Sequence, residues 1–282
     1  MANFIETLKV LFLGIVEGIT EWLPISSTGH MLLVDEFLQM KESAEFKELF
    51  FIVIQLGAIL AVILLFWERL FPFELRKKAE GGIKIKKNIM NMWGKVVLAC
   101  IPGAAAVFLF DDYIEAHFET PTVIALALIL YGIAFLIIEK KNADSPGKIT
   151  SVDEISYKNA FLIGLFQVLS IIPGTSRSGS TIIGARLLGI SRVAAAEFTF
   201  FLAVPVMAGY SLLKLLKFGF DFTGAQLLLL GIGCLSAFIT SYFCIKFLMD
   251  YVKKHSFAAF GWYRIALGAV VLAYFHLFPL IF

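Results

Sequence analysis

Residues 17–30 read EGITEWLPISSTGH, and residues 173–181 read PGTSRSGST. Each run places ionisable or hydroxyl side chains inside a long apolar stretch of the chain. At the depth of a lipid bilayer such side chains are costly unless they are paired or face water, so they mark a functional site by default. The two runs therefore decide both how the chain folds and where its chemistry lies.

The two polar runs match each other at a constant offset of 150 residues. The matched pairs are Glu17 with Gln167, Ser26 with Ser176, Thr28 with Ser178, and Gly29 with Gly179. This agreement predicts a duplicated element that contains the chemistry.

The composition is that of a membrane protein. Hydrophobic residues make up 59% of the chain and charged residues 16%, whereas soluble domains carry about 25% charged residues. Mean hydropathy is +0.86, and phenylalanine alone occurs 29 times. These values exclude an ordinary soluble globular protein.

Six stretches are long enough to cross a hydrocarbon core, which takes about 20 apolar residues. They lie near 47–68, 89–110, 120–139, 196–217, 224–249 and 258–281. Two further apolar stretches, 4–38 and 157–190, are each broken by a polar run. We expect an all-α integral membrane protein with six transmembrane helices and two re-entrant helical hairpins.

The expected elements divide residues 1–282, a single membrane domain, into two repeats. Residues 1–145 hold one hairpin and three spans, and residues 155–282 hold the other hairpin and three spans. Because three is odd, the second repeat is inverted relative to the first. Inverted repeats place their sites near the membrane midplane, where broken helices meet.

Lysine and arginine residues predict the orientation. The loop after the first span contains Arg69, Arg76, Lys77, Lys78, Lys84, Lys86, Lys87 and Lys95. The third span ends at Lys140 and Lys141, and Lys148 and Lys158 lie beyond it. Lys246, Lys253 and Lys254 lie at the end of the fifth span. Cytoplasmic loops carry an excess of such residues, so these regions should be cytoplasmic and both termini outside. Lys214 and Lys217 fall on the other side and count against this orientation.

Glu17 and Glu21 are four residues apart, so a helix would project both carboxylates from one face. Inside an apolar hairpin this pair needs a cation, a proton or a hydrogen-bonded partner. A hard cation such as Mg²⁺ suits paired carboxylates and substrate phosphate oxygens. The alternative is an interfacial pair at the mouth of the hairpin.

Pro24 should end the first helix of that hairpin, and Ser26, Ser27 and Thr28 should cap the next one. The N-terminus of the second helix is then a ready anion site. Ser27 and His30 are neighbours on its first turn, and a hydroxyl beside an imidazole is the minimum arrangement for an activated nucleophile. A capping serine with a structural histidine is the alternative.

The second run repeats this arrangement. Pro173 and Gly174 make a turn, and Ser176 to Ser180 cap the returning helix. Arg177 adds a fixed positive charge that can bind phosphate oxygens in a bidentate manner. Arg177 could instead be the charge partner of Glu17 or Glu21. Together the two runs predict a site for a highly charged anion, and the apolar surroundings suggest an anion attached to a lipid.

A further acidic group is expected to be a solvated periplasmic loop between the second and third spans, although it could be imagined as a metal site. Its members are Asp111, Asp112, Glu115, His117 and Glu119.

The chain resembles a known family at these residues. Two motifs carry the resemblance, Glu17-x-x-x-Glu21 with Pro24-x-Ser26-Ser27-Thr28-Gly29-His30, and Pro173-Gly174-x-Ser176-Arg177-Ser178-x-x-Thr181. They are similar to those of the bacterial undecaprenyl-diphosphate phosphatases, the bacitracin-resistance protein family. The resemblance implies an interdigitated inverted-repeat fold and an inner-membrane enzyme that removes the terminal phosphate of undecaprenyl diphosphate, which recycles the carrier lipid for peptidoglycan synthesis. By position it implies functional roles for Glu17, Glu21, Ser27, His30, Ser176, Arg177 and Thr181.

The sequence therefore predicts a phosphatase with Ser27 as nucleophile and His30 as its base, although His30 or a water could attack instead. Mg²⁺ or Ca²⁺ is expected near Glu17 and Glu21. The residues expected to bind the diphosphate are Arg177, Ser176, Thr181, Ser26, Thr28, Ser178 and Gly174. The site is expected to face the periplasm, the partners to be lipid and membrane rather than nucleic acid, and a homodimer is possible.

The alternative is an inverted-repeat transporter or flippase for a lipid phosphate or another anion. A carrier needs an anion site but no nucleophile with a base, so the set of Ser27, His30 and Glu21 favours the enzyme.

Overall fold

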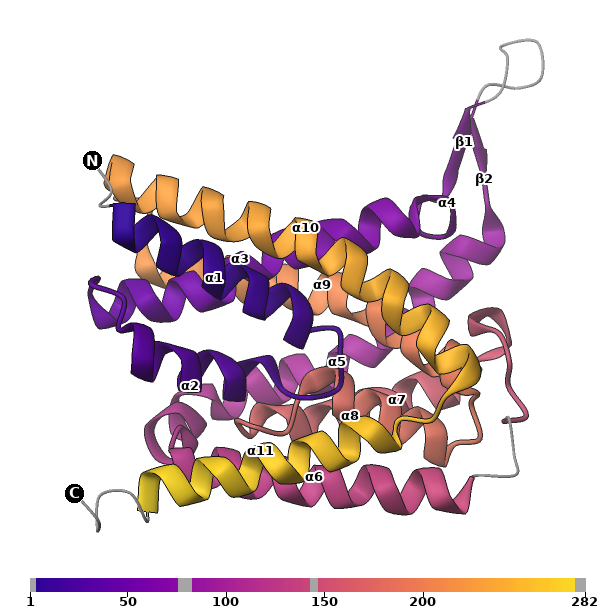
Figure 1. Ribbon diagram of the computed structural model, residues 1–282. Helices are drawn as coiled ribbons and strands as arrows, with labels where there is room; N and C mark the ends of the chain where they lie inside the picture. Colours follow the sequence, from indigo (N-terminus) through magenta and orange to yellow (C-terminus); the bar gives the residue numbers. More distant parts are fainter. Residues whose placement is uncertain (1–3, 76–82, 143–146, 277–282) are drawn as a thin grey trace.

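The computed structural model describes residues 4–75, 83–142 and 147–276 (Figure 1). Within these ranges the named elements are helices apart from one small antiparallel sheet of β1 (Phe73–Leu75) and β2 (Ile83–Ile85). An isolated parallel bridge also joins Ile149 and Ile190. The long helices are α3 (Ala44–Leu65), α5 (Lys87–Phe118), α6 (Pro121–Lys141), α9 (Arg192–Phe218), α10 (Gly224–Lys254) and α11 (Ala258–His276). The short helices are α1 (Phe4–Thr20), α2 (Ser27–Leu38), α4 (Trp67–Leu70), α7 (Tyr157–Val168) and α8 (Arg177–Leu187), with 3-10 turns η2 (Val152–Glu154) and η3 (Leu169–Ile171).

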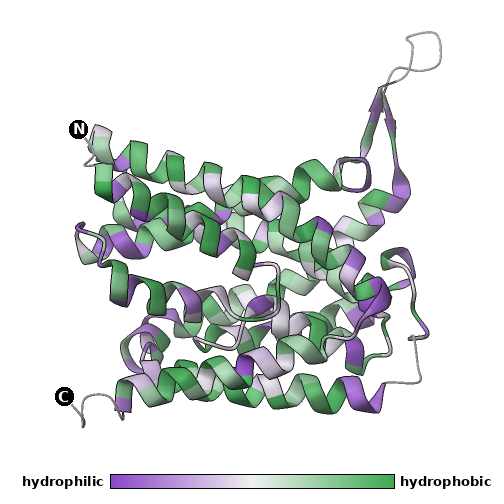
Figure 2. Ribbon diagram, in the orientation of Figure 1, coloured by the Kyte–Doolittle hydropathy of each residue, from purple (hydrophilic) through white to green (hydrophobic). Residues whose placement is uncertain are grey.

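The six long helices are each long and apolar enough to cross a membrane, which confirms the six predicted spans. Hydrophobic residues dominate these helices, and hydrophilic ones gather in the β1–β2 hairpin and near the helix ends (Figure 2). The predicted end of the last span at residue 281, and Arg76, Lys77 and Lys78 of the basic loop, lie outside the described residues.

The prediction that residues 111–119 form a loop between the second and third spans is wrong for most of these residues. α5 continues as a helix through Asp111, Asp112 and Glu115 to Phe118, well beyond the predicted end of the span at residue 110. Hydropathy marks where a helix leaves the membrane, and the chain has no residue that breaks the helix at that point. The break comes at Thr120, which caps α6 by accepting from the Val123 N–H, with Pro121 in the first turn.

Two pairs of short helices enter the bundle from opposite ends. α1 and α2 run in opposite directions and are joined by a turn inside the molecule (Figure 1). α7 and α8 do the same from the end of the molecule that carries β1 and β2. Both turns, residues 21–26 and 172–176, therefore lie in the interior.

Glycines let the short helices approach the long ones closely. α1 packs along α10, and a Cβ on Gly14 would lie 2.6 Å from the Gly233 carbonyl oxygen. α7 packs along α5, and a Cβ on Gly164 would lie 2.4 Å from the Ala99 carbonyl oxygen. Gly14 and Gly164 are 150 residues apart, the offset that relates the two polar runs.

Ion pairs join α3 and α9 near both ends of these helices. Lys214 Nζ lies 2.5 Å from Glu48 Oε1 and 3.1 Å from Glu115 Oε2. At the other end Arg69, just beyond α3, pairs with Glu197 of α9. Lys217 pairs with Asp112 at 3.2 Å. Lys214 and Lys217 are thus both paired with acidic residues.

Candidate active site

The two interior turns have the same local structure. Ser26 and Ser176 are the N-caps of α2 and α8, and their hydroxyls accept from the N–H groups of Gly29 and Gly179 at 3.3 and 3.1 Å. Both have positive φ, 73° and 72°, in a region that residues other than glycine rarely adopt. Such strain is concentrated at functional sites. The predicted caps are confirmed, and each turn presents a helix N-terminus to the interior.

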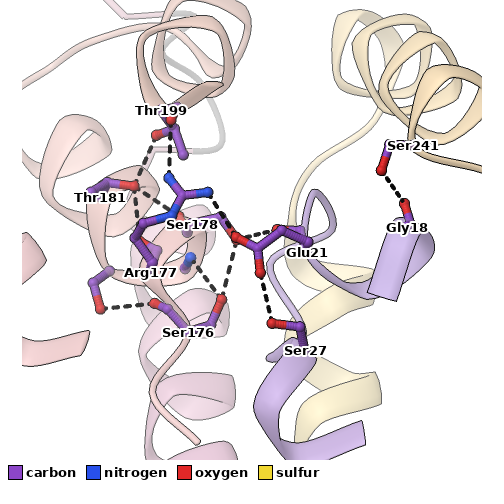
Figure 3. Close-up of polar contacts among 11 residues, drawn as sticks. Gly18, Glu21, Ser27, Ser176, Arg177, Ser178, Thr181, Thr199 and Ser241 are labelled. Carbon is purple, nitrogen blue, oxygen red and sulfur yellow. Dashed lines mark hydrogen bonds and ion pairs between the residues drawn. The ribbon is translucent and has the colours of Figure 1, made fainter. Parts of the chain in front are cut away.

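Glu21 joins the two turns (Figure 3). Its Oε1 accepts from Arg177 Nη2 at 2.9 Å, and its Oε2 accepts from Ser27 Oγ at 2.7 Å. All three side chains are largely buried. The alternative that Arg177 is a charge partner of a glutamate is thus observed, and the same carboxylate orients the Ser27 hydroxyl.

Arg177 is held from its other side by α9. Its Nη1 donates to the Thr199 carbonyl oxygen at 3.1 Å, while its Nε has no partner. The Thr181 hydroxyl lies 2.9 Å from the Thr199 hydroxyl and also bonds to the Arg177 carbonyl oxygen. Thr181 and Thr199 therefore help to hold Arg177 in place. The sequence motifs did not reveal Thr199.

Ser178 and Gly174 shape the second turn. Ser178 donates to the Glu21 carbonyl oxygen at 3.2 Å and lies 3.2 Å from the Ser176 hydroxyl. Gly174 has φ +88°, and a Cβ there would lie 2.5 Å from the Ile124 carbonyl oxygen. Ser178 therefore links the two turns, and Gly174 lets the second turn approach α6 closely. Thr28, in the first helical turn of α2, is exposed.

His30 has other partners than Ser27. Its Nδ1 lies 2.7 Å from the Ser26 carbonyl oxygen and its Nε2 lies 2.7 Å from the Tyr263 hydroxyl, and the two rings are stacked. A carbonyl only accepts, so Nδ1 must carry the proton and, in the neutral ring, Nε2 accepts from Tyr263. The hydrogen bond expected between Ser27 and His30 is replaced by the one between Ser27 and Glu21.

Glu17 is the deepest carboxylate of the site. It is 1% exposed, and its Oε1 has no hydrogen-bond partner. Pro24 was predicted to end the first helix, but α1 already ends at Thr20. The Glu21 N–H still donates to the Glu17 carbonyl oxygen at 3.0 Å, as in a helical turn. A buried carboxylate oxygen without a partner fits a cation or a proton. The donor set is thus compatible with a divalent cation on Glu17, whereas the oxygens of Glu21 already accept from Arg177 and Ser27.

Besides Thr199, the motifs did not reveal two further site residues, and both of these lie on α11. Tyr263 contacts His30, and Arg264 is fully buried and bonds to carbonyl groups of both turns. An arginine inside an apolar span is itself a functional signal, so Arg264 could have been flagged from sequence. Tyr263 gave no such signal.

The fold and this site define a class of protein, a multi-pass helical membrane protein with a buried serine–glutamate–arginine site between two helix N-termini. Comparison with known proteins agrees with that class. Residues 10–270 match the family described as bacitracin resistance protein BacA. The chain belongs to this family.

Full-length relatives support the assignment. An undecaprenyl-diphosphatase of Enterococcus faecalis is 63% identical over 270 residues, which cover 96% of this chain and 97% of the relative. An undecaprenyl-diphosphatase of Lachnoclostridium phytofermentans is 60% identical, with 97% and 98% covered. Undecaprenyl-diphosphatase 1 of Clostridium acetobutylicum is 55% identical, with 96% and 98% covered.

Proposed function

We propose that this protein hydrolyses undecaprenyl diphosphate to undecaprenyl phosphate and inorganic phosphate, and so recycles the cell-wall carrier lipid and confers bacitracin resistance. The family and the names of its full-length relatives support this activity. One observation on this chain assigns the proposed chemistry to particular atoms. Glu21 bonds at once to the Ser27 hydroxyl and to Arg177, between two helix N-termini.

The diphosphate is bound by positive groups that the two turns supply. Arg177 and the N–H groups at the starts of α2 and α8 favour an anion. Phosphoryl transfer depends mainly on positioning and charge stabilisation. Ser26, Thr28, Ser176 and Ser178 lie on these first turns, so we assign the phosphate groups to this region.

Ser27 is the proposed nucleophile and Glu21 its base. Ser27 Oγ attacks the terminal phosphorus, its proton passes to Glu21 Oε2, and the bond from phosphorus to the bridging oxygen breaks. Undecaprenyl phosphate leaves with that oxygen. Water then attacks the phosphoserine, phosphate is released, and the Glu21 proton returns to Ser27. In the neutral imidazole His30 Nε2 carries the lone pair, which accepts from the Tyr263 hydroxyl. We assign to this nitrogen the proton of the attacking water, with Tyr263 moving aside, and that proton then leaves with the released phosphate.

A divalent cation, Mg²⁺ or Ca²⁺, is proposed at Glu17 with Glu21 nearby. The buried oxygen of Glu17 that lacks a partner supports this assignment. When bound, the cation would offset the negative charge of the diphosphate.

The two short-helix pairs are proposed to be re-entrant hairpins in an inverted repeat, with the site open to the periplasmic face of the bacterial inner membrane. The lysine and arginine distribution supports the periplasmic opening, and three features of the structure support the inverted repeat. They are the entry of the two pairs from opposite ends (Figure 1), the shared positive φ of Ser26 and Ser176, and the packing of α1 on α10 and of α7 on α5.

Phosphate release by the purified protein tests the function. In detergent with undecaprenyl diphosphate and Mg²⁺, we expect turnover, loss of turnover in excess EDTA, and recovery with Mg²⁺ or Ca²⁺. Ser27→Ala should bind the diphosphate but lose activity. Binding without phosphate release by the wild type would favour a carrier, and full turnover in EDTA would remove the cation from the mechanism.

A further inference from the structure

Arg264 is the one described side chain that hydrogen-bonds to the backbone of both interior turns. Its Nη1 donates to the Pro24 carbonyl oxygen at 3.2 Å. Its Nη2 donates to the carbonyl oxygens of Gly174 and Thr175 at 2.8 and 2.9 Å. The first carbonyl belongs to the turn before α2 and the other two to the turn before α8, so one guanidinium spans the joint between them.

The surroundings of Arg264 are unusual for a buried cation. The side chain is 0% exposed and lies over the Tyr131 ring, with its guanidinium carbon 5.7 Å from the ring centroid. Among the described residues it takes part in no ion pair, and its hydrogen bonds go only to backbone carbonyls. A buried arginine without a carboxylate costs free energy, so stability alone does not account for Arg264 at this position.

The turns that Arg264 joins carry opposite parts of the reaction. Ser27 begins α2, directly after the first turn, and Arg177 begins α8, directly after the second. The attack angle at phosphorus therefore depends on the distance between the two turns. A planar guanidinium can fix that distance because its donors have a rigid geometry, which a lysine ammonium lacks.

We propose that Arg264 is a positioning residue that fixes the spacing of the two helix N-termini by binding the backbone of both turns. This inference rests on the proposed phosphatase function of the same site. Substrate can still bind when Arg264 is changed, because Arg177 and the N-termini remain. The attack geometry is lost, so the effect falls on kcat rather than on KM.

Arg264→Lys and Arg264→Gln test the proposal, with farnesyl diphosphate as a soluble probe carrying the same head group. Arg264→Lys keeps the charge and should lower kcat by about 100-fold, the loss that a displacement of roughly 1 Å causes. KM should stay within about threefold of wild type, since ground-state binding is retained. The shift in thermal unfolding temperature caused by inorganic pyrophosphate should likewise be retained in both variants.

Arg186→Lys is the matched control. Arg186 is also buried, at 2% exposed, and also donates to a carbonyl, that of Ile190, but it pairs with Glu139 near the far end of α8. Its replacement should lower the unfolding temperature and leave kcat per folded molecule unchanged.

The outcomes separate the inference from the function it rests on. An inactive wild type would defeat the proposed function itself. With an active wild type, a normal kcat in Arg264→Lys would show that charge alone suffices and would overturn the positioning role. A parallel rise in KM would make Arg264 a binding residue. Failure of both Arg264 variants to fold, when Arg186→Lys folds, would assign Arg264 to stability and also overturn the proposal.

Discussion

Glu21 is the residue on which both halves of the site depend. Glu21→Gln keeps the shape of the side chain but removes the charge that faces Arg177 and the base that faces Ser27. We expect kcat to fall by about 100- to 10,000-fold, the usual contribution of a positioned base. The variant should still fold, because Arg177 keeps its bond to the Thr199 carbonyl oxygen.

Phosphate release from folded, purified protein measures this effect. Glu36→Gln is the control, since Glu36 is an exposed carboxylate of α2, the helix that follows the turn containing Glu21. Turnover by Glu21→Gln at the rate of Glu36→Gln would transfer the role of base to His30, as the sequence first suggested.

Single residues of the site were predictable, but their pairings were not. Glu17, Glu21, Ser27 and Arg177 stood out because polar groups are costly in an apolar segment. The spacing of Ser27 and His30 on one helix suggested a pair. The Glu21 carboxylate reaches Ser27 only because residues 21–26 fold back, and the conformation of that turn depends on contacts with other helices.

The packing of the short helices against the long ones depends on close contacts at glycine residues. A Cβ at Gly164 would lie 2.4 Å from a backbone oxygen of α5, which cannot move away cheaply. Gly164→Ala should therefore destabilise the protein by about 1–3 kcal/mol, as overpacking usually does. Gly231→Ala in α10 meets no atom within 4 Å and should be neutral or stabilise by up to about 1 kcal/mol.

Thermal unfolding in detergent, followed by circular dichroism, compares the two variants. Equal unfolding temperatures would mean that α7 does not depend on close contact with α5. The phosphatase activity of Gly164→Ala should fall as well, since α7 leads into the turn before Arg177.

At this scale the sequence predicted the long helices better than their ends. Apolar length alone located all six spans, because the hydrocarbon core imposes it. The end of α5 was missed since a helix can continue into water until a cap or proline stops it. The packing partners of the short helices could not be predicted from the sequence either. Gly14 and Gly164 indicate that another segment approaches closely, but they do not indicate which helix it is.

The orientation of the whole molecule is a prediction from its lysines and arginines. Thr28 and Thr150 are both exposed. Thr28 lies at the start of α2, next to the first interior turn, and Thr150 lies in the connection before α7. In a background without Cys100, Cys234 and Cys244, Thr28→Cys should react with a membrane-impermeant thiol reagent added to intact spheroplasts. Thr150→Cys should react only after the cytoplasmic face is opened.

The two positions control for each other, because each should be protected under the condition that labels the other. Reversed labelling would invert the topology and place the site on the cytoplasmic side. Labelling of Thr28→Cys from neither side would show that lipid or protein closes the first turn in the membrane.

The place of Arg264 in the chain bears on how the protein is made. The backbone carbonyls it binds belong to residues 24, 174 and 175, yet the arginine itself lies in α11, the last described helix. Both short-helix pairs are complete at Leu187, so the ribosome synthesises them before it adds this side chain. The hydrogen bonds by which Arg264 joins the two turns can therefore form only after both short-helix pairs have been synthesised.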